Sequence, residues 1–417
     1  MNRIIVNGGK SLKGEVNINS AKNSVLPIIA ASILSRDKCI IENTPMLEDV
    51  FVISEVLRSI CSEVDIDKEN NKIVIDTSNI CTLEPSSEFV KKLRASFLIM
   101  GPMISRFGSF KISLPGGCNI GSRPIDLHLK GLNALGADIN IGYGYVEAKA
   151  DKLKGDTIYL DFPSVGATEN LMMAAVLAEG ETIIQNAAEE PEIQDLARFL
   201  NSMGANIVGA GTDTINIIGV KDLKGVVHKP IYDRIEAGTF MTAAAITRSK
   251  IKLNGVNEEH LRPIIAKLTE IGTKIDVDGE SMMVDGNHNL KPVDIKTMPY
   301  PGFPTDMQAQ TMALLTSIEG TSIVTETIFE NRFMHAIEMK RMGANIKIDG
   351  RSAVIEGGNE LTGCEVKSTD LRAGAALILC GLAARGSTDV TDVYHIDRGY
   401  DHIEKKLQKL GADIYRI

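Results

Sequence analysis

The distribution of apolar and polar residues divides the chain into six copies of one unit. Each copy ends in an amphipathic helix followed by a turn and a strand, and this pattern begins at residues 57, 132, 200, 268, 339 and 407. In five copies a glycine follows the last helical residue, where a left-handed C-cap is favoured, and the first copy has Cys61 there instead. Because the pattern recurs every 68 to 75 residues, it predicts a repeat architecture.

A second pattern alternates with the first at the same period. It begins near residues 21, 94, 164, 234, 305 and 369 as a short polar opening followed by an almost wholly apolar helix. Helices that are apolar on all sides are buried, whereas the neighbouring strands alternate in polarity, as in KIKLNGV. We therefore expect an α/β fold with helices inside and sheets outside, the reverse of a doubly wound fold.

The length of the chain indicates more than one domain. A chain of 417 residues is too long for one ordinary core, and six units divide into two domains of three. We expect one domain over 22–230 and a second over 1–21 plus 231–417, with the crossing within 225–233 and the active site in the cleft between them. The N-terminal strand RIIVNG is expected to complete the second domain.

Composition and charge narrow the class of partner. Hydrophobic residues make up 44% and charged residues 24% of the chain, which is typical of a globular enzyme. A net charge of −9 argues against a nucleic-acid partner, so an anionic ligand must be bound by local arginines and lysines. No apolar run is long enough to span a membrane and no signal peptide is evident, so we expect no membrane partner and a cytoplasmic location.

The polar openings of the six apolar helices are candidates for anion binding. Helix N-termini offer free N–H groups and a partial positive charge. The alternative is that the same residues are N-caps, and for Ser164 and Asp370 the two interpretations stay open. Taken together, the six openings favour a site for a multiply negative ligand. They contain Lys22 and Asn23, Arg94, Ser164 to Gly166, Asp233 and Arg234, Asp306, and Asp370 and Arg372.

The cysteines suggest one reactive position. Their spacing matches no metal site, so reduced thiols are expected rather than disulfides. Four of them (Cys39, Cys61, Cys364 and Cys380) lie in apolar stretches and are expected to be small buried side chains, while Cys81 has no assigned role. Cys118 differs because it lies in the glycine-rich PGGCNIGSRP, where Arg123 should lower the thiol pKa. We expect a lid whose cysteine donates a proton, with a carboxylate elsewhere as base.

Several long segments carry a resemblance to a known family. Among them are AKNSVLP, PGGCNIGSRPIDLH, SVGATEN, NAAEEPEI, FPTDMQAQ and YHIDRGY. Over essentially its whole length the chain resembles the UDP-N-acetylglucosamine 1-carboxyvinyltransferases, whose fold has two inside-out α/β domains. The resemblance implies transfer of enolpyruvyl from phosphoenolpyruvate to the 3′-hydroxyl of UDP-N-acetylglucosamine with release of phosphate, the first committed step of peptidoglycan precursor synthesis. It implies no metal or organic cofactor.

The resemblance also implies roles for individual residues. Cys118 would protonate C3 of phosphoenolpyruvate and be alkylated by fosfomycin, and Asp306 would take the proton from the sugar hydroxyl. The implied catalytic set is Cys118, Asp306, Lys22, Asn23 and Arg398. The implied substrate-binding set is Lys22, Asn23, Arg94, Arg123, Pro124, Ile125, Asp126, Leu127, Ser164, Val165, Gly166, Asp306, Ile328, Arg332, Arg372 and Arg398. For Leu127 and Ile328, ordinary packing remains an alternative. Phe162 stands where some members have lysine and receives no role.

Two other functions compete with this interpretation. The first is 5-enolpyruvylshikimate-3-phosphate synthase, against which the cysteine-bearing lid argues. The second is a non-catalytic UDP-sugar-binding paralogue, against which the intact set of Lys22, Cys118, Asp306 and Arg398 argues. Release of phosphate with one acceptor but not the other would separate these functions.

Overall fold

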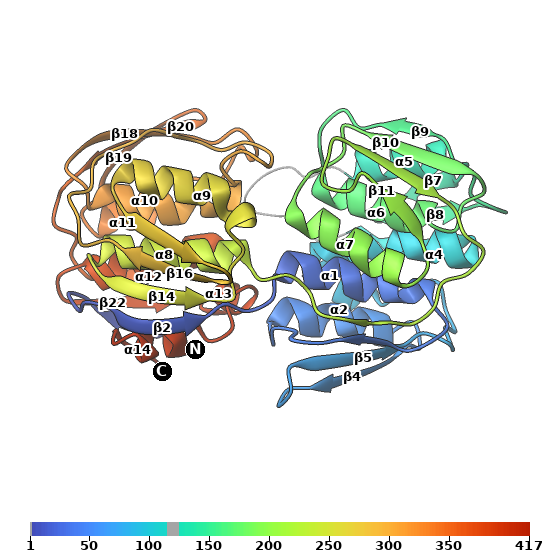
Figure 1. Ribbon diagram of the computed structural model, residues 1–417, viewed down its shortest axis with the longest axis horizontal. Helices are drawn as coiled ribbons and strands as arrows, with labels where there is room; N and C mark the ends of the chain where they lie inside the picture. The colour runs from blue at the N-terminus through green and yellow to red at the C-terminus, as the bar shows by residue number, and fades with distance from the viewer. Residues whose placement is uncertain (1, 115–124) are drawn as a thin grey trace. The chain divides into compact units, whose positions relative to one another are not determined.

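The computed structural model describes residues 2–114 and 125–417, so Cys118, Arg123 and Pro124 lie outside the described residues. The chain forms two compact units (Figure 1). Unit 1 contains residues 2–19 and 232–417, and unit 2 contains residues 20–114 and 125–231. Over the described ranges, no helix has both the length and the apolar character needed to cross a membrane.

Unit 2 is built from three copies of a helix–strand–helix–strand–strand motif. The first copy is α1 (Lys22–Ala31), β3 (Cys39–Ile41), α2 (Glu48–Arg58), β4 (Glu63–Asp67) and β5 (Lys72–Asp76). The second is α4 (Met100–Phe107), β6 (Ser109–Ser113), α5 (Asp126–Ala134), β7 (Asp138–Gly142) and β8 (Tyr145–Lys149). The third is α6 (Val165–Ala175), β10 (Glu181–Gln185), α7 (Pro191–Ser202), β11 (Asn206–Val208) and β12 (Thr214–Ile218). Connecting elements are η1 (Ser32–Leu34), α3 (Ser87–Lys92), η2 (Arg94–Ile99), β9 (Thr157–Tyr159) and β13 (Val227–His228).

Unit 1 repeats the same motif three times. The first copy is α8 (Arg234–Ile246), β14 (Lys250–Asn254), α9 (Glu258–Ile271), β15 (Lys274–Asp278) and β16 (Ser281–Asp285). The second is α10 (Gln308–Thr316), β18 (Gly320–Thr325), α11 (His335–Arg341), β19 (Asn345–Asp349) and β20 (Ser352–Gly357). The third is α12 (Leu371–Ala383), β22 (Ser387–Thr391), α14 (Ile403–Lys409) and β23 (Asp413–Arg416). The remaining elements are β1 (Ile4–Asn7), β2 (Lys13–Asn17), β17 (Ile295–Lys296), η3 (Thr305–Met307), β21 (Glu365–Lys367) and α13 (Tyr394–Asp397).

The sheets lie on the outside of each unit and share one strand order. Five four-stranded sheets place a short leading strand parallel to the first strand of a copy, as in β17-β18-β20-β19, and the sixth is β6-β8-β7. In the last copy β1 takes the third place, with Ile4 opposite both Val390 of β22 and Arg416 of β23. The N-terminal strand therefore completes unit 1, as its sequence predicted.

Two leading strands are exchanged where the chain passes between the units. β2 precedes the first helix of unit 2 but pairs in parallel with β14 of unit 1. β13 precedes the first helix of unit 1 but pairs in parallel with β3 of unit 2. Each unit therefore contains one strand that leads into the other.

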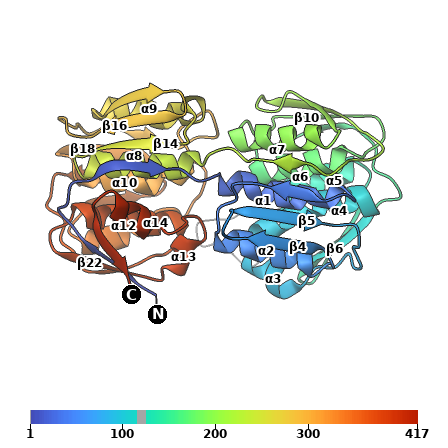
Figure 2. The same ribbon diagram turned by 60° about the horizontal axis from the view of Figure 1, so that its bottom comes forward.

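The apolar helices form the core of each unit. Every residue of α8 and α10 is buried, as are all but one residue of α1, whereas many strands alternate between buried and exposed positions. In each unit the helices lie between the outer strands (Figures 1 and 2). A strand residue has one face toward these helices and one toward solvent, which explains the alternation. The expected α/β architecture with helices inside and sheets outside is confirmed.

The predicted left-handed C-caps are present in all six copies. Five glycines in this position have positive φ, for example Gly136 at 95°, and Cys61 has φ of 73°. The N–H of the next residue closes the turn, since Ser62 donates to the carbonyl of Leu57 at 3.2 Å and Ala137 to that of Leu132 at 3.1 Å. Cys61 thus adopts a backbone conformation that costs a non-glycine residue free energy.

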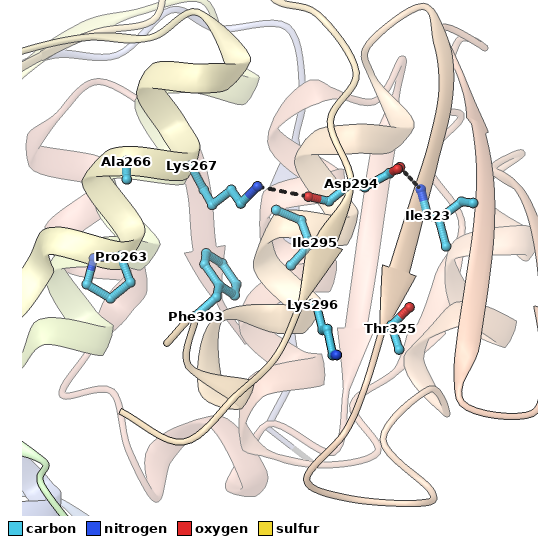
Figure 3. Close-up of a pocket in the computed structure, with 9 residues that line it drawn as sticks. All are labelled: Pro263, Ala266, Lys267, Asp294, Ile295, Lys296, Phe303, Ile323 and Thr325. Carbon is cyan, nitrogen blue, oxygen red and sulfur yellow. Dashed lines mark hydrogen bonds between the residues drawn. The ribbon is translucent and has the colours of Figure 1, made fainter. Parts of the chain in front are cut away.

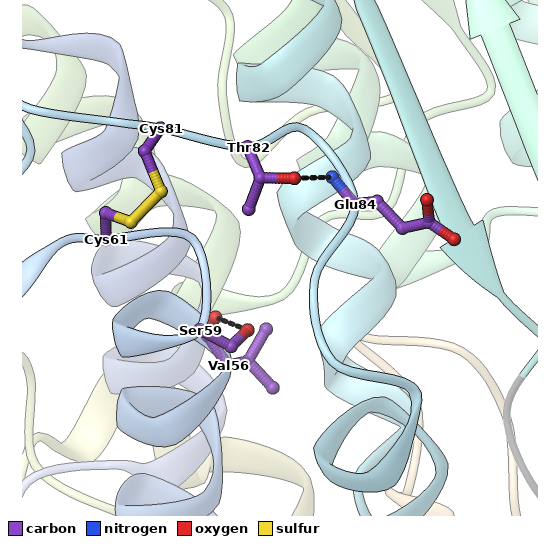
Figure 4. The surroundings of a disulfide bond; sticks show 6 residues. All are labelled: Val56, Ser59, Cys61, Cys81, Thr82 and Glu84. Atoms are coloured by element: carbon purple, nitrogen blue, oxygen red, sulfur yellow. Dashed lines mark hydrogen bonds between the residues drawn. A yellow bond between two sulfur atoms is a disulfide. The ribbon is translucent and has the colours of Figure 1, made fainter.

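The expectations for Cys61 and for reduced thiols are wrong. Cys61 is exposed and forms a disulfide with Cys81, whose Cα lies 5.6 Å away (Figure 4). The apolar residues around Cys61 belong to the end of α2, whereas Cys61 itself lies in the exposed turn. Cys39 and Cys380 are fully buried as expected, and burial raises the pKa of Cys380 to about 12. Cys364 is only partly buried.

Candidate active site

Asp306 is the centre of an arginine cluster in unit 1. It lies in η3, directly before α10, and both of its oxygens are bonded. Arg332 Nη2 donates to Oδ1 at 2.7 Å, and Arg372 donates to Oδ2 from Nη2 at 2.8 Å and from Nε at 3.3 Å. The side chain of Asp306 is 25% exposed and those of both arginines are 5% exposed. The carboxylate is therefore partly open to solvent, whereas the two arginine side chains that bond it are buried.

The two arginines decide the protonation state of Asp306. Burial raises the pKa of the carboxyl, but the charges of Arg372 and Arg332 outweigh burial and hold the pKa well below its usual range. Asp306 is therefore ionised at neutral pH. A carboxylate held in this way is a weak base, and an anionic ligand that drew the guanidinium groups away would raise its pKa.

Arg372 and Arg398 lie near the same end of α12. Asp370 caps this helix by accepting from the N–H of Arg372 at 2.9 Å. The Arg372 guanidinium lies 5.6 Å from the ring centre of Tyr400, which is buried. Arg398 is half-buried at the C-terminus of α13, and a methyl group at the next residue, Gly399, would lie only 2.6 Å from the side chain of Leu371 in α12.

Lys22 opens α1 in unit 2 and is paired with a carboxylate that the sequence analysis missed. Its Nζ donates to Asp49 Oδ2 at 3.0 Å, and the two side chains are 11% and 3% exposed. Asp49 lies in the first turn of α2, where acidic residues stabilise a helix, so its sequence context suggested only a structural role. Asn23, the next residue of α1, is half-buried.

The start of α6 faces a buried histidine. Asn170 donates from Nδ2 to the carbonyl of Phe97 at 2.8 Å and accepts from the N–H of Gly101 at 2.6 Å, which fixes the orientation of its amide. Its Nδ2 also lies 2.9 Å from His128 Nδ1, so that nitrogen accepts and the ring proton is on Nε2. A methyl group on Gly166 would lie 3.3 Å from His128 Cε1.

Several predicted residues gather around His128. Burial, with a smaller contribution from the charge of Arg94, lowers its pKa to about 4, which places the Arg94 side chain within electrostatic reach of the ring. His128 itself lies in the first turn of α5, which begins at Asp126. The structure thus brings Arg94 and the starts of α5 and α6 together. The histidine was missed as a member of this cluster because its contacts are made to distant parts of the chain.

Several of the polar side chains at the helix starts act as N-caps, which was one of the two interpretations left open by the sequence. Ser164 caps α6 by accepting from the N–H of Ala167 at 3.4 Å, and Asp233 and Asp370 cap α8 and α12. Asp306 caps no helix. Leu127 packs in part against the core, as do Ile125 and Val165.

A cavity of about 420 Å³ in unit 1 is distinct from these residues (Figure 3). It lies beside α9, β17 and β18, and its walls include Phe303, Ile323 and Lys296. Lys267 crosses it to donate to the carbonyl of Asp294 at 3.1 Å. Among the predicted site residues that the structure describes, none lines this cavity.

Comparisons with known proteins define first the class and then the family. The family model for EPSP synthase (3-phosphoshikimate 1-carboxyvinyltransferase) matches residues 6–407. The enolpyruvyl transferase NikO from Streptomyces tendae has a TM-score of 0.91 at 25% identity, covering 100% of this chain and 98% of that one. EPSP synthase from Acinetobacter baumannii has a TM-score of 0.78 at 19% identity, covering 100% and 99%, and shares the fold. The chain is therefore an enzyme of the enolpyruvyl transferase class.

The curated relatives specify the family. UDP-N-acetylglucosamine 1-carboxyvinyltransferase 2 from Clostridium tetani is 92% identical over 417 residues, covering 100% of both chains. UDP-N-acetylglucosamine 1-carboxyvinyltransferase 1 from Clostridium acetobutylicum is 67% identical, again over 100% of both. The chain belongs to the UDP-N-acetylglucosamine 1-carboxyvinyltransferases, as its motifs predicted.

Proposed function

We propose that the chain transfers the enolpyruvyl group of phosphoenolpyruvate to the 3′-hydroxyl of UDP-N-acetylglucosamine and releases phosphate. The observation that carries this proposal is Asp306, an ionised and partly exposed carboxylate between two buried arginines. The names of the relatives that are 92% and 67% identical support the choice of acceptor. We also infer that the enzyme acts in the cytoplasm, in peptidoglycan precursor synthesis.

The proposed reaction is an addition followed by an elimination. Cys118 gives a proton to C3 of phosphoenolpyruvate while Asp306 takes the proton of the sugar hydroxyl, whose oxygen bonds to C2. The tetrahedral product then loses phosphate from C2 and a proton from C3, which restores the double bond. One acid and one base acting on opposite partners meet the needs of the addition step.

The anionic groups of phosphoenolpyruvate require cations. We assign this role to Lys22, Arg123 and Arg398, with Arg332 and Arg372 in support, because arginine matches phosphate and carboxylate geometry. Binding of the substrate anion would weaken the hold of the two supporting arginines on Asp306. The pKa of Asp306 would then rise, which makes the carboxylate a stronger base only when the substrate is present.

The nucleotide is assigned to the cluster around the start of α6. In the run Ser164 to Gly166, the N–H groups of Val165 and Gly166 would bind diphosphate oxygens, since a helix N-terminus is an anion site. The N–H of Ser164 itself donates to the carbonyl of Phe162 at 2.7 Å. Arg94 adds charge, and Pro124 to Leu127 and Ile328 would contact the rest of the sugar nucleotide. Phe162, which is 44% exposed, can offer no charge to the phosphates.

The test is release of phosphate from phosphoenolpyruvate with UDP-N-acetylglucosamine, beside a sample with shikimate 3-phosphate. We expect release with the sugar nucleotide only, loss of release after preincubation with fosfomycin, and little release by Asp306→Asn. Glu360→Gln, an exposed change in unit 1, serves as the control variant and should match the unmodified enzyme. Release of phosphate with shikimate 3-phosphate would contradict the proposed acceptor. The absence of release with both acceptors would favour a non-catalytic sugar-nucleotide-binding protein.

A further inference from the structure

Glu326 is a buried carboxylate that joins three separate segments of unit 1. It follows β18 directly and is 0% exposed. Oε1 accepts from Thr297 Oγ1 at 2.8 Å and from the N–H groups of Ile328 at 2.8 Å and Phe329 at 3.2 Å. Oε2 accepts from Thr305 Oγ1 at 2.8 Å. One side chain thus fixes the segments at 297, at 305 and at 326–329.

The bond from Thr305 gives this network a direction. A threonine hydroxyl has one proton, and Thr305 donates it to Glu326, so its oxygen must act as acceptor toward other groups. Arg332 Nη1 donates to that oxygen at 2.8 Å, while Nη2 of the same guanidinium donates to Asp306 at 2.7 Å. The order of donation is therefore fixed from Arg332 through Thr305 to Glu326.

The second half of the network orients the turn after β18. Thr297 Oγ1 accepts from the N–H of Thr327 at 2.9 Å, and the Thr327 hydroxyl donates to the Thr297 carbonyl at 2.6 Å. Together with the two N–H groups that Glu326 accepts, these bonds fix the backbone on both sides of Ile328. A neutral amide at 326 would have one accepting oxygen and could not accept both from Thr305 and from the three donors on the Oε1 side, whereas a carboxylate accepts in all four contacts.

We propose that Glu326 is a positioning residue for catalysis, acting through Thr305 and Arg332 on Asp306 and through backbone N–H groups on Ile328. It touches neither substrate. The proposal rests on the proposed function, because it gives Asp306 the part of the base and Ile328 the part of a nucleotide contact. Its effect is to hold one arm of Arg332 so that the other meets the carboxylate of Asp306 in a single geometry.

A matched pair of variants tests the relay without removing the buried charge. Thr305→Ser keeps the hydroxyl, and Thr305→Val keeps the shape but neither donates nor accepts. We expect kcat of the serine variant within about twofold of the unmodified enzyme and kcat of the valine variant lower by about tenfold, the equivalent of one hydrogen bond. In the valine variant the hold of Arg332 on Asp306 loosens, so the acid limb of the pH–kcat profile should move to higher pH.

Glu326→Gln provides the second measurement. It should raise KM for UDP-N-acetylglucosamine and lower kcat, and hydrogen exchange should quicken at the amides of residues 328 and 329. Glu360→Gln should change none of these three quantities. Equal kcat and equal pH profiles for Thr305→Val and Thr305→Ser would overturn the proposal. If the unmodified enzyme releases no phosphate, the proposed function fails and this inference with it; if it is active and the variants match it, only the positioning role fails.

Discussion

The buried histidine of unit 2 should make the stability of that unit depend on pH. His128 is 8% exposed and its pKa is lowered to about 4, against about 6.5 in an unfolded chain. Between these two values the unfolded chain binds a proton that the folded unit does not. The contribution of the neutral His128 ring to the free energy of unfolding is therefore complete above pH 6.5. It falls as the pH drops through this window and is lost below about pH 4.

The size of the effect follows from the width of the window. Lowering the pH from 7 to 5 takes it about 1.5 units below the unfolded pKa, and each unit corresponds to about 1.4 kcal/mol. His128 should therefore lower the free energy of unfolding by about 2 kcal/mol at pH 5 relative to pH 7. The perturbation is His128→Gln, whose amide oxygen can still accept from Asn170. The variant does not titrate, so the difference in free energy of unfolding between it and the unmodified chain should shift by about 2 kcal/mol between the two pH values.

The assay is urea unfolding followed by circular dichroism at pH 7 and pH 5, with amide exchange in α5 and α6 identifying the transition of unit 2. His288→Gln is the matched control because that side chain is 45% exposed and lies in unit 1. If the difference between His128→Gln and the unmodified chain is the same at both pH values, His128 does not carry a buried neutral ring and the reasoning is wrong.

Two further predictions concern buried charge and backbone conformation in unit 2. Asp49→Asn removes the charged partner of Lys22, so phosphoenolpyruvate would no longer have to displace a carboxylate from Lys22 when it binds, which isothermal titration measures. Because the lysine charge stays buried without its partner, we expect urea unfolding to show a loss of about 3 kcal/mol in the free energy of unfolding. An unchanged free energy of unfolding would contradict the pairing. Under reducing conditions Cys61→Gly should raise the free energy of unfolding by about 1 kcal/mol, since glycine adopts the positive φ of 73° without cost, and Gly136→Ala should lower it by a similar amount. A lower free energy of unfolding for Cys61→Gly, or a higher one for Gly136→Ala, would refute the conformational argument.

Features that depend on local sequence were predictable. Five of the C-caps follow from a glycine after an amphipathic helix, and the buried helices follow from apolar runs, because both signals lie within one element. The same logic identified the polar starts of these helices. It could not say which of these residues cap a helix, since Asp370 and Asp306 look alike in sequence, yet Asp370 caps α12 whereas Asp306 is bonded by the side chains of Arg332 and Arg372.

Features that depend on distant contacts were missed. Cys61 and Cys81 are 20 residues apart with no motif between them, and their pairing depends on the chain returning to the end of α2. Asp49 lies at an ordinary acidic helix start, and Glu326 lies after an ordinary strand. Each acquires its role from side chains in other segments, which a pattern of apolar and polar residues does not encode.

The exchange of leading strands has a consequence for how the chain folds during synthesis. Unit 2 is closed by β13, so all of its strands are available once residue 228 has been made. Unit 1 is complete only once residue 416 has been made, because β1 pairs with β23 through Ile4 and Arg416. Contacts between such distant residues form slowly, and an unpaired strand is open to wrong partners meanwhile. A chain whose synthesis stops after unit 2 would therefore contain a folded unit 2 preceded by two unpaired strands, β1 and β2.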